Sequence, residues 1–387
     1  MTTSKLLAPL SFAVPLLLIG CGGGSSSSDE NDQADQGTSC AESIESCSQV
    51  AIAGITSDFT SSAVIYLKDA GFDTTGEEAV SDISVSANNG HFYRIGRFGL
   101  DFIEKYSFSD PEAPIWLYST KPTPESASAN PQAIGYYGQS TGFIATLGGE
   151  LLVVDLNASS QADFIQNSID LSGFDTADGV AEAVDVKVVG ERVYVLLQRL
   201  ESFSPVKAGM VVVVDASSQE VLSSVVLKTR NPSGFSYVAN SEELFVSSVG
   251  AYGFGEASPQ YTGGIEALNL ATLETRLVLD DGDADDHPYG QISDVAVISD
   301  DLGYFLGYHG WQDIDLYDFN PSTGEVYGLL NAFSGRDIRD ITVVDNTLWI
   351  AEGDSGTGAG VWLIDFFNEP VGALSLNIDP AKIAVDN

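Results

Sequence analysis

One unit of β-branched and apolar residues recurs along most of this chain, and it constrains the fold more than any other feature of the sequence. Its clearest copy covers residues 183–228 and contains four short runs separated by Gly, Asp, Ser and Pro, which is the pattern of four short strands. Four strands joined in order form a small antiparallel sheet that cannot bury both of its faces alone. The unit therefore predicts neighbours of the same kind.

The first strand of the unit repeats as an apolar-x-apolar core at intervals of 42 to 60 residues, near the length of a four-stranded propeller blade. The cores begin at Ile83, Ile134, Val184, Phe235, Val295, Ile341 and Ile383. The N-terminal copy, from Val50, lacks a first strand, whereas residues 380–387 are a first strand with nothing after it. We therefore predict an all-β, seven-bladed β-propeller of four-stranded antiparallel blades over residues 48–387. Its C-terminal strand joins the N-terminal blade and removes an open sheet edge.

This repeat resembles the YVTN-type seven-bladed β-propellers over roughly residues 48–387, although the YVTN tetrapeptide itself is absent. The resemblance implies the fold and no single activity, because a fold does not determine function. Trp349 and Trp362 lie in strand patterns and are expected in the core. Asp and Asn residues at the ends of the third strands precede turns, where such side chains bond their own backbone, so we interpret them as structural.

The first residues of the chain predict export and lipid anchoring. Lys5 precedes an apolar run over residues 6–20 that is short for a membrane span and has the form of a signal peptide, residues 1–20. The run ends in the tetrapeptide LIGC, which resembles a bacterial lipobox and makes Cys21 the predicted lipidation site; an uncleaved signal anchor is the alternative. Gly22 rather than Asp follows, which in the resembled sorting rule favours the outer membrane. Periplasmic and surface orientations both stay open.

Residues 21–47 predict a lipid-anchored flexible tether, because their Gly, Ser, Asp and Gln residues cannot bury a core. Cys40 and Cys47 lie beside the start of the fold. Two cysteines in an exported chain predict a disulfide. Metal binding by the pair is the alternative, and it is disfavoured because no His lies nearby in the sequence.

The formal net charge of −39, from 55 acidic and 16 basic residues, limits the partners of this chain. Nucleic acids and anionic membrane surfaces need a basic face, so we expect no nucleic-acid partner and membrane contact through the lipid anchor only. Two interpretations of the acidity stay open, namely a solvated surface suited to a salty medium and cation binding.

In a propeller the connections before each first strand and those between second and third strands share one face, and here these connections are long. The residue just before each first strand should ring the channel mouth on that face. This predicts a ring of Asp82, Ala133, Ala183, Gly234, Asp294, Asp340 and Lys382. Its acidic members and Lys382 fall on neighbouring blades, so either Lys382 neutralises the carboxylates and pins the closing strand, or the cluster binds a cation or polar ligand.

Two further sets of residues in these connections are candidates for binding. The run LDDGDADDHPYG, residues 279–290, has the alternating acids of a calcium loop at Asp281, Asp283 and Asp285 but lacks the later Gly and the distal Glu. Calcium, the one cofactor suggested, and a solvated acidic loop both stay open. Aromatic and imidazole rings on exposed loops favour stacking against a ligand. They are Tyr252, Phe254, Tyr261, His287, Tyr289, His309 and Trp311.

The sequence contains no nucleophile elbow, Walker loop, HExxH or CxxCH motif, so it favours binding over catalysis without settling the choice. We predict an outer-membrane-anchored lipoprotein whose elaborated propeller face binds a small-molecule ligand or an envelope protein, as in the capture of cargo for a transporter. One alternative is a metal-dependent propeller lactonase or lyase centred on Asp82, Asp294 and Asp340. Another is a structural protein-interaction module of an envelope complex.

Overall fold

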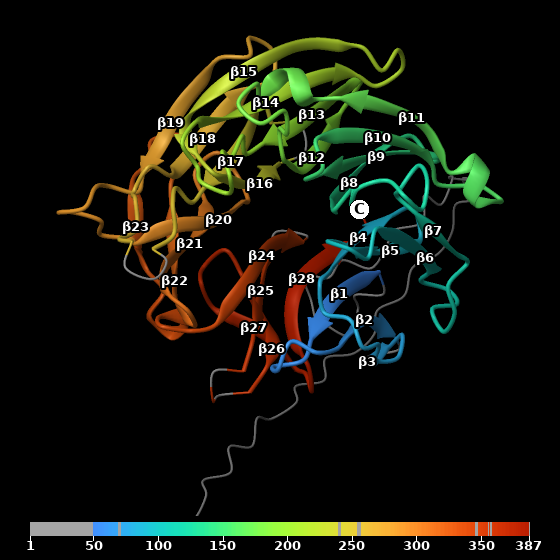
Figure 1. Ribbon diagram of the computed structural model, residues 1–387. Coiled ribbons are helices and arrows are strands. Elements are labelled where there is room, and N and C mark those ends of the chain that lie inside the picture. Colours follow the sequence, from blue (N-terminus) through green and yellow to red (C-terminus); the bar gives the residue numbers. More distant parts are fainter. Residues whose placement is uncertain are drawn as a thin grey trace, which may run out of the picture. The chain divides into compact units, whose positions relative to one another are not determined.

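The computed structural model describes residues 49–386, apart from residues 69–70, 239–240, 254–256, 345–346, 355 and 357. In this part of the chain, seven four-stranded antiparallel sheets follow one another around a central channel (Figure 1). The predicted all-β, seven-bladed fold is confirmed. The predicted signal peptide and tether, with Cys21, Cys40 and Cys47, and the loop residue Phe254 lie outside the described residues.

Each blade is described from its innermost strand outward. Blade 1 consists of β28 (Asp379–Val385), β1 (Val50–Ile55), β2 (Ser62–Lys68) and β3 (Gly71–Thr74). Blade 2 consists of β4 (Ile83–Asn88), β5 (His91–Gly96), β6 (Phe102–Ser107) and β7 (Trp116–Ser119). Blade 3 consists of β8 (Pro131–Tyr137), β9 (Thr141–Thr146), β10 (Glu150–Asp155) and β11 (Ile165–Asp170). Blade 4 consists of β12 (Ala183–Val189), β13 (Arg192–Leu197), β14 (Ala208–Asp215) and β15 (Val221–Arg230).

The remaining three blades follow the same order. Blade 5 consists of β16 (Pro232–Tyr237), β17 (Glu243–Ser248), β18 (Gly264–Asn269) and β19 (Thr275–Asp280). Blade 6 consists of β20 (Gln291–Val297), β21 (Gly303–Gly310), β22 (Asp313–Phe319) and β23 (Val326–Leu329). Blade 7 consists of β24 (Ile338–Val344), β25 (Thr347–Glu352), β26 (Gly360–Ile364) and β27 (Pro370–Ser375). In the described part of the chain, the connections contain the 3-10 turns η2 (Gln161–Asp163), η3 (Ser172–Phe174) and η4 (Asn331–Phe333).

The core lies between the blades, and this explains why the middle strands are apolar on both faces. Along β13, Val193 and Val195 pack in one cluster with blade 3, whereas Tyr194 and Leu196 pack in another with blade 5. Successive residues of a strand point to opposite faces of a sheet, so a blade with neighbours on both sides buries both sets. Trp349 is fully buried in the same way, as predicted, whereas Trp362 is only half-buried.

The C-terminal strand closes the ring as the sequence predicts. β28 pairs antiparallel with β1, and Ile383 lies opposite Ile52 in the register. Ile383 is buried, and Arg339 of blade 7 bonds Asp379 at the start of β28 with a nitrogen–oxygen distance of 2.9 Å. The chain end is therefore part of the sheet and part of an interface between blades.

Antiparallel blades place two kinds of connection on opposite faces of the ring. We name the long-loop face after residues 198–207, 249–263, 281–290 and 353–359, which join second to third strands or one blade to the next. The short-turn face carries the tight connections, such as the one at Gly190. The expectation that the connections of the long-loop face are long is wrong for blade 6, because β21 continues to Gly310 and β22 begins at Asp313, so that the chain turns at two residues only. Within the described residues, no helix has the length and apolar character of a membrane span.

Candidate functional site

A cavity of about 680 Å³ opens at the mouth of the central channel on the long-loop face. Its walls are the beginnings of the innermost strands, and its rim is formed by residues of the loops above them. This volume is within the range of small-molecule sites, which commonly combine apolar and aromatic walls with a few convergent polar groups.

A β-bulge sets which side chains face this cavity. In six of the seven blades the register between the first and second strands shifts near the start of the first strand, as between Ala183 and Asp185 on β12. Blade 2 has no such shift. The structurally equivalent positions are Ser84, Ala133, Asp185, Gly234, Asp294, Asp340 and Lys382.

The predicted ring was therefore wrong at two blades. Asp185 replaces Ala183, and Ser84 replaces Asp82. Each error is a slip of two residues, which the period of a strand cannot reveal because residues i and i+2 share a face. Asp82 bonds the Arg97 guanidinium at 2.6 Å and accepts the backbone N–H of Phe98 at 3.1 Å. The predicted carboxylate cluster of Asp82, Asp294 and Asp340 is not formed.

The ring carboxylates have a structural role that is shared by three blades. Asp185 accepts the backbone N–H of Phe235 on the next blade at 2.8 Å. In the same way Asp294 accepts the N–H of Ile341 at 3.3 Å. Asp340 accepts that of Ile383, at 2.8 Å. Each bond joins two innermost strands that belong to different sheets, so these side chains fasten neighbouring blades together.

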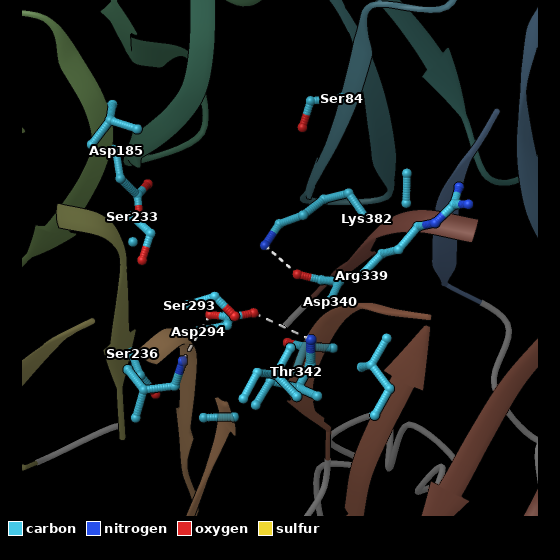
Figure 2. Close-up of a pocket in the computed structure, with 18 of the residues that line it drawn as sticks. Ser84, Asp185, Ser233, Ser236, Ser293, Asp294, Arg339, Asp340, Thr342 and Lys382 are labelled. Atoms are coloured by element: carbon cyan, nitrogen blue, oxygen red, sulfur yellow. Dashed lines mark hydrogen bonds and ion pairs between the residues drawn. The ribbon is translucent and has the colours of Figure 1, made fainter. Parts of the chain in front are cut away.

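Within the described residues, one of these three carboxylates forms an ion pair. Lys382 Nζ lies 2.6 Å from Asp340 Oδ1, and Figure 2 shows the lysine extending into the cavity beside this carboxylate. Although burial lowers the pKa of Lys382, the Asp340 and Asp294 carboxylates outweigh it and raise that pKa above its ordinary value. The predicted neutralisation by Lys382 is thus present at Asp340. Among the described residues, no cation lies within ion-pair distance of Asp185 or Asp294.

Burial perturbs the two carboxylates that have no cation at ion-pair distance among the described residues. Burial, together with the nearby Asp340 carboxylate, raises the pKa of Asp294 to about 7, while Lys382 opposes the shift. Burial also raises the pKa of Asp185 above its usual range. Perturbed carboxyl groups in a cavity are a common property of functional sites, because a bound partner can complete their interactions.

Lys187 is the corresponding unpaired cation. It lies two residues after Asp185 on the channel face of β12, and its ammonium is 5.8 Å from the centre of the Tyr237 ring. In the described part of the chain it forms no ion pair, and burial lowers its pKa. The structure thus brings a second lysine into the channel that the sequence reasoning missed.

The cavity is balanced in charge although the protein is strongly acidic. The chain has 55 acidic and 16 basic residues. The cavity lining contains equal numbers of each, namely the bases Arg97, Lys187, Arg339 and Lys382 and the acids Asp185, Asp294, Asp337 and Asp340. A quarter of all basic residues therefore gather at one site. Hydroxyl groups lie between them, among them Ser84, Ser233, Ser236 and Ser293 (Figure 2).

Aromatic side chains form one side of the rim. Trp311 is 67% exposed and its ring centre lies 5.8 Å from that of Phe59 on blade 1. Tyr252 meets Tyr308 edge to face at 5.1 Å. All four line the cavity. Of these, the sequence reasoning selected Tyr252 and Trp311 and missed the others.

Phe59 belongs to a wider pattern that could have been found in the sequence. The connections between second and third strands of five different blades each carry an exposed aromatic residue, namely Phe59, Phe98, Phe203, Tyr252 and Trp311. Phe59 and Phe203 have φ angles of 58° and 67°, a left-handed conformation that is unfavourable for bulky residues. Aligning the loops of the repeats, as well as their strands, would have revealed this set.

The other predicted aromatic and histidine residues have different surroundings. Tyr261 and His287 stack on each other with ring centres 4.1 Å apart, away from the cavity lining. Tyr289 packs on Phe305 and Tyr317 in the core between blades 5 and 6. His309 Nε2 lies 3.2 Å from Asp315 Oδ2. None of the four predicted residues Tyr261, His287, Tyr289 and His309 lines the cavity.

The geometry does not support the predicted calcium loop. Asp281 is buried and accepts the Gly263 N–H, and burial raises its pKa to about 7. Asp283 instead turns outward and accepts the backbone N–H of Asp285, closing an Asx turn. Over the described residues, no group of three or more His, Cys, Asp or Glu side chains is placed to hold a metal ion.

Comparisons with known proteins agree with the fold. No protein-family model and no curated protein sequence matches the chain. Hydrazine synthase from Kuenenia stuttgartiensis is similar in structure with a TM-score of 0.55 at 12% identity, over 84% of this chain and 95% of that one. The computationally designed protein Ika8 gives a TM-score of 0.51 at 11% identity, over 86% of each chain.

AztD from Citrobacter koseri gives a TM-score of 0.49 at 13% identity and covers 87% of this chain and 97% of its own. At identities this low a structural likeness concerns the fold and not the site. The function must therefore be argued from the cavity itself.

Proposed function

We propose that this chain is a ligand-binding propeller of the bacterial cell envelope, which holds a small molecule in the cavity at its channel mouth. The observation that carries the proposal is the balanced, partly unpaired charge of the cavity within a protein of net charge −39. A solvated acidic surface would not gather four bases beside four acids beneath an aromatic rim. Such convergence is expected where a ligand is oriented by a few polar groups.

The lipid anchor belongs to the same proposal. Acylation at Cys21 and the Gly/Ser-rich tether would hold the propeller at the outer membrane. Delivery of the bound molecule to an envelope transporter is the use that this arrangement favours. The likeness to YVTN-type propellers supports the same scaffold and adds no ligand.

The experiment is to identify small molecules that remain bound to the purified full-length protein. Mass spectrometry after denaturation should detect a compound that is retained at least tenfold less by a Tyr252→Ala/Trp311→Ala double variant, equivalent to about 1.4 kcal/mol. The matched control is Phe367→Ala, because Phe367 is an exposed aromatic residue on the short-turn face. Equal retention by the rim variant and the wild type would refute binding at this cavity.

A further inference from the structure

The face of β12 that lines the channel carries two opposite charges that are not joined in an ion pair. Asp185 and Lys187 are two residues apart, which corresponds to about 6.6 Å along a strand. The carboxylate is held by backbone donors, Val186 N–H at 2.7 Å and Phe235 N–H at 2.8 Å, and the ammonium lies over the Tyr237 ring. Both side chains lean toward β16 of the next blade. In the described part of the chain no ion pair joins them, although each charge favours the ionised form of the other.

β16 leaves room for a molecule between these charges. Gly234 lines the cavity, and a Cβ atom added to it would meet only Asp185 Oδ2, at 3.6 Å. The ring position next to Asp185 therefore has no side chain and leaves an open niche. Two residues further along β16, Ser236 Oγ accepts the N–H of Val297 at 2.9 Å. Its hydroxyl hydrogen is thus available to donate into the channel.

We propose that this niche binds a small zwitterion of the α-amino-acid type, with its ammonium on Asp185 over Gly234 and its carboxylate on Lys187 and the Ser236 hydroxyl. This inference rests on the proposed function and names the class of ligand. Opposite charges on residues about 6.6 Å apart along one strand suit a ligand whose own opposite charges are separated by two or three bonds, since each end can form a charge-assisted hydrogen bond. A purely cationic or purely anionic ligand would leave one of the two groups unsatisfied.

The rim indicates the rest of the ligand. The same cavity is also lined by the rings of Tyr252, Tyr308, Trp311 and Phe59, and the Arg339 guanidinium lies 5.8 Å from the centre of the Phe59 ring. Apolar and aromatic side chains gain most from such surroundings, through buried area and ring contacts. The zwitterion therefore carries an apolar or aromatic side chain that points toward the long-loop face.

Three probes with the same ring separate the two charges. Phenylalanine has both, phenethylamine has only the ammonium, and 3-phenylpropanoate has only the carboxylate. Binding to the dialysed full-length protein is measured by calorimetry at pH 7.5. We expect phenylalanine to bind at least tenfold more tightly than either other probe. Equal affinities for all three would overturn the proposal, and so would a lack of phenylalanine binding.

Variants assign each charge to its residue. Asp185→Asn keeps an acceptor for the Phe235 N–H and should weaken phenylalanine and phenethylamine at least tenfold while sparing 3-phenylpropanoate. Lys187→Met should weaken phenylalanine and 3-phenylpropanoate at least tenfold while sparing phenethylamine. Ser236→Ala should weaken the same two probes by a smaller factor. Asp300→Asn and Lys228→Met, at exposed positions, are the matched controls. Losses that are the same for all three probes would contradict the assignment.

The outcome can be separated from that of the proposed function. If phenylalanine does not bind but the co-purifying compound is still lost from the Tyr252→Ala/Trp311→Ala variant, then the zwitterion is wrong and the cavity remains the binding site. If the compound is retained equally by that variant, the proposed function itself fails.

Discussion

The channel contains two Asp–Lys combinations that differ in one respect. Where blades 7 and 1 meet, Asp340 and Lys382 are bonded at 2.6 Å, and the pair fastens the closing strand. On blade 4, Asp185 makes the same kind of inter-blade hydrogen bond, but Lys187 stays apart from it. The fold therefore needs the carboxylate as a fastener in both places and needs the cation in only one. The unused charges on blade 4 are the ones available to a ligand.

The largest effect is expected from removing the closing strand itself. Deleting residues 380–387 removes Lys382 together with Ile383, whose burial alone contributes about 1.5–3 kcal/mol, and it exposes strand edges. We expect the melting temperature to fall severely or the protein to fail to fold. Val371→Ala, on the exposed part of the outer strand β27, should change stability by less than about 0.5 kcal/mol. An unchanged melting temperature after the deletion would contradict the role of β28.

The two lysines should differ in stability when each is replaced by Met. Lys382→Met leaves the buried Asp340 carboxylate without its cation; because Lys382 is half-exposed, we expect a loss of about 1–3 kcal/mol, less than for a fully buried pair. Lys187→Met removes no ion pair and should stay within about 0.5 kcal/mol of the wild type. Denaturant unfolding at pH 7 measures both. Equal losses of unfolding free energy would show that Lys187 contributes to stability as much as Lys382 does.

The buried Asp294 carboxyl should make the stability of the protein depend on pH. The pKa of Asp294 is raised to about 7 in the folded protein, above its unfolded value, so ionisation disfavours folding. The contribution of Asp294 to the free energy of unfolding is therefore full at low pH and is lost as the pH rises from about 4 through 7. Asp294→Asn should remove this loss. Relative to the wild type, we expect its free energy of unfolding to rise by about 1–3 kcal/mol between pH 4 and 8.

The control for this titration is Asp300→Asn on the short-turn face, which should follow the wild-type profile. Parallel profiles for Asp294→Asn and the wild type would mean that Asp294 ionises with an ordinary pKa and is better solvated than its place in the channel implies.

The sequence predicted the blades well, because each depends on local strand patterns repeated at a regular interval. It also predicted that Asp340 and Lys382 would meet, since ring closure makes their blades neighbours. It could not place Asp185, because a bulge shifts the register and a strand pattern looks the same after a slip of two residues. Lys187 was missed because a strand pattern does not show that its ammonium lies over the Tyr237 ring of the next blade.

The predictions of aromatic and acidic loop residues show the same limit. Loop composition correctly indicated exposed rings at Tyr252 and Trp311, but it could not distinguish them from Tyr289, which packs in the core. The spacing of Asp281, Asp283 and Asp285 suggested convergence, whereas backbone hydrogen bonds turn the first inward and the second outward. Loop conformation therefore decided the function of these residues more than their spacing did.

The most direct test of the account fills the open niche next to Asp185. Gly234→Leu places a side chain where the cavity is empty and where no backbone atom lies within 4 Å of the new Cβ, so the fold should tolerate it. Gly328→Leu, at a similarly open glycine on the outer strand β23, is the control. We expect both variants to keep the wild-type melting temperature, and Gly234→Leu alone to lose phenylalanine and the co-purifying compound. Unchanged binding by a folded Gly234→Leu protein would contradict binding at this niche.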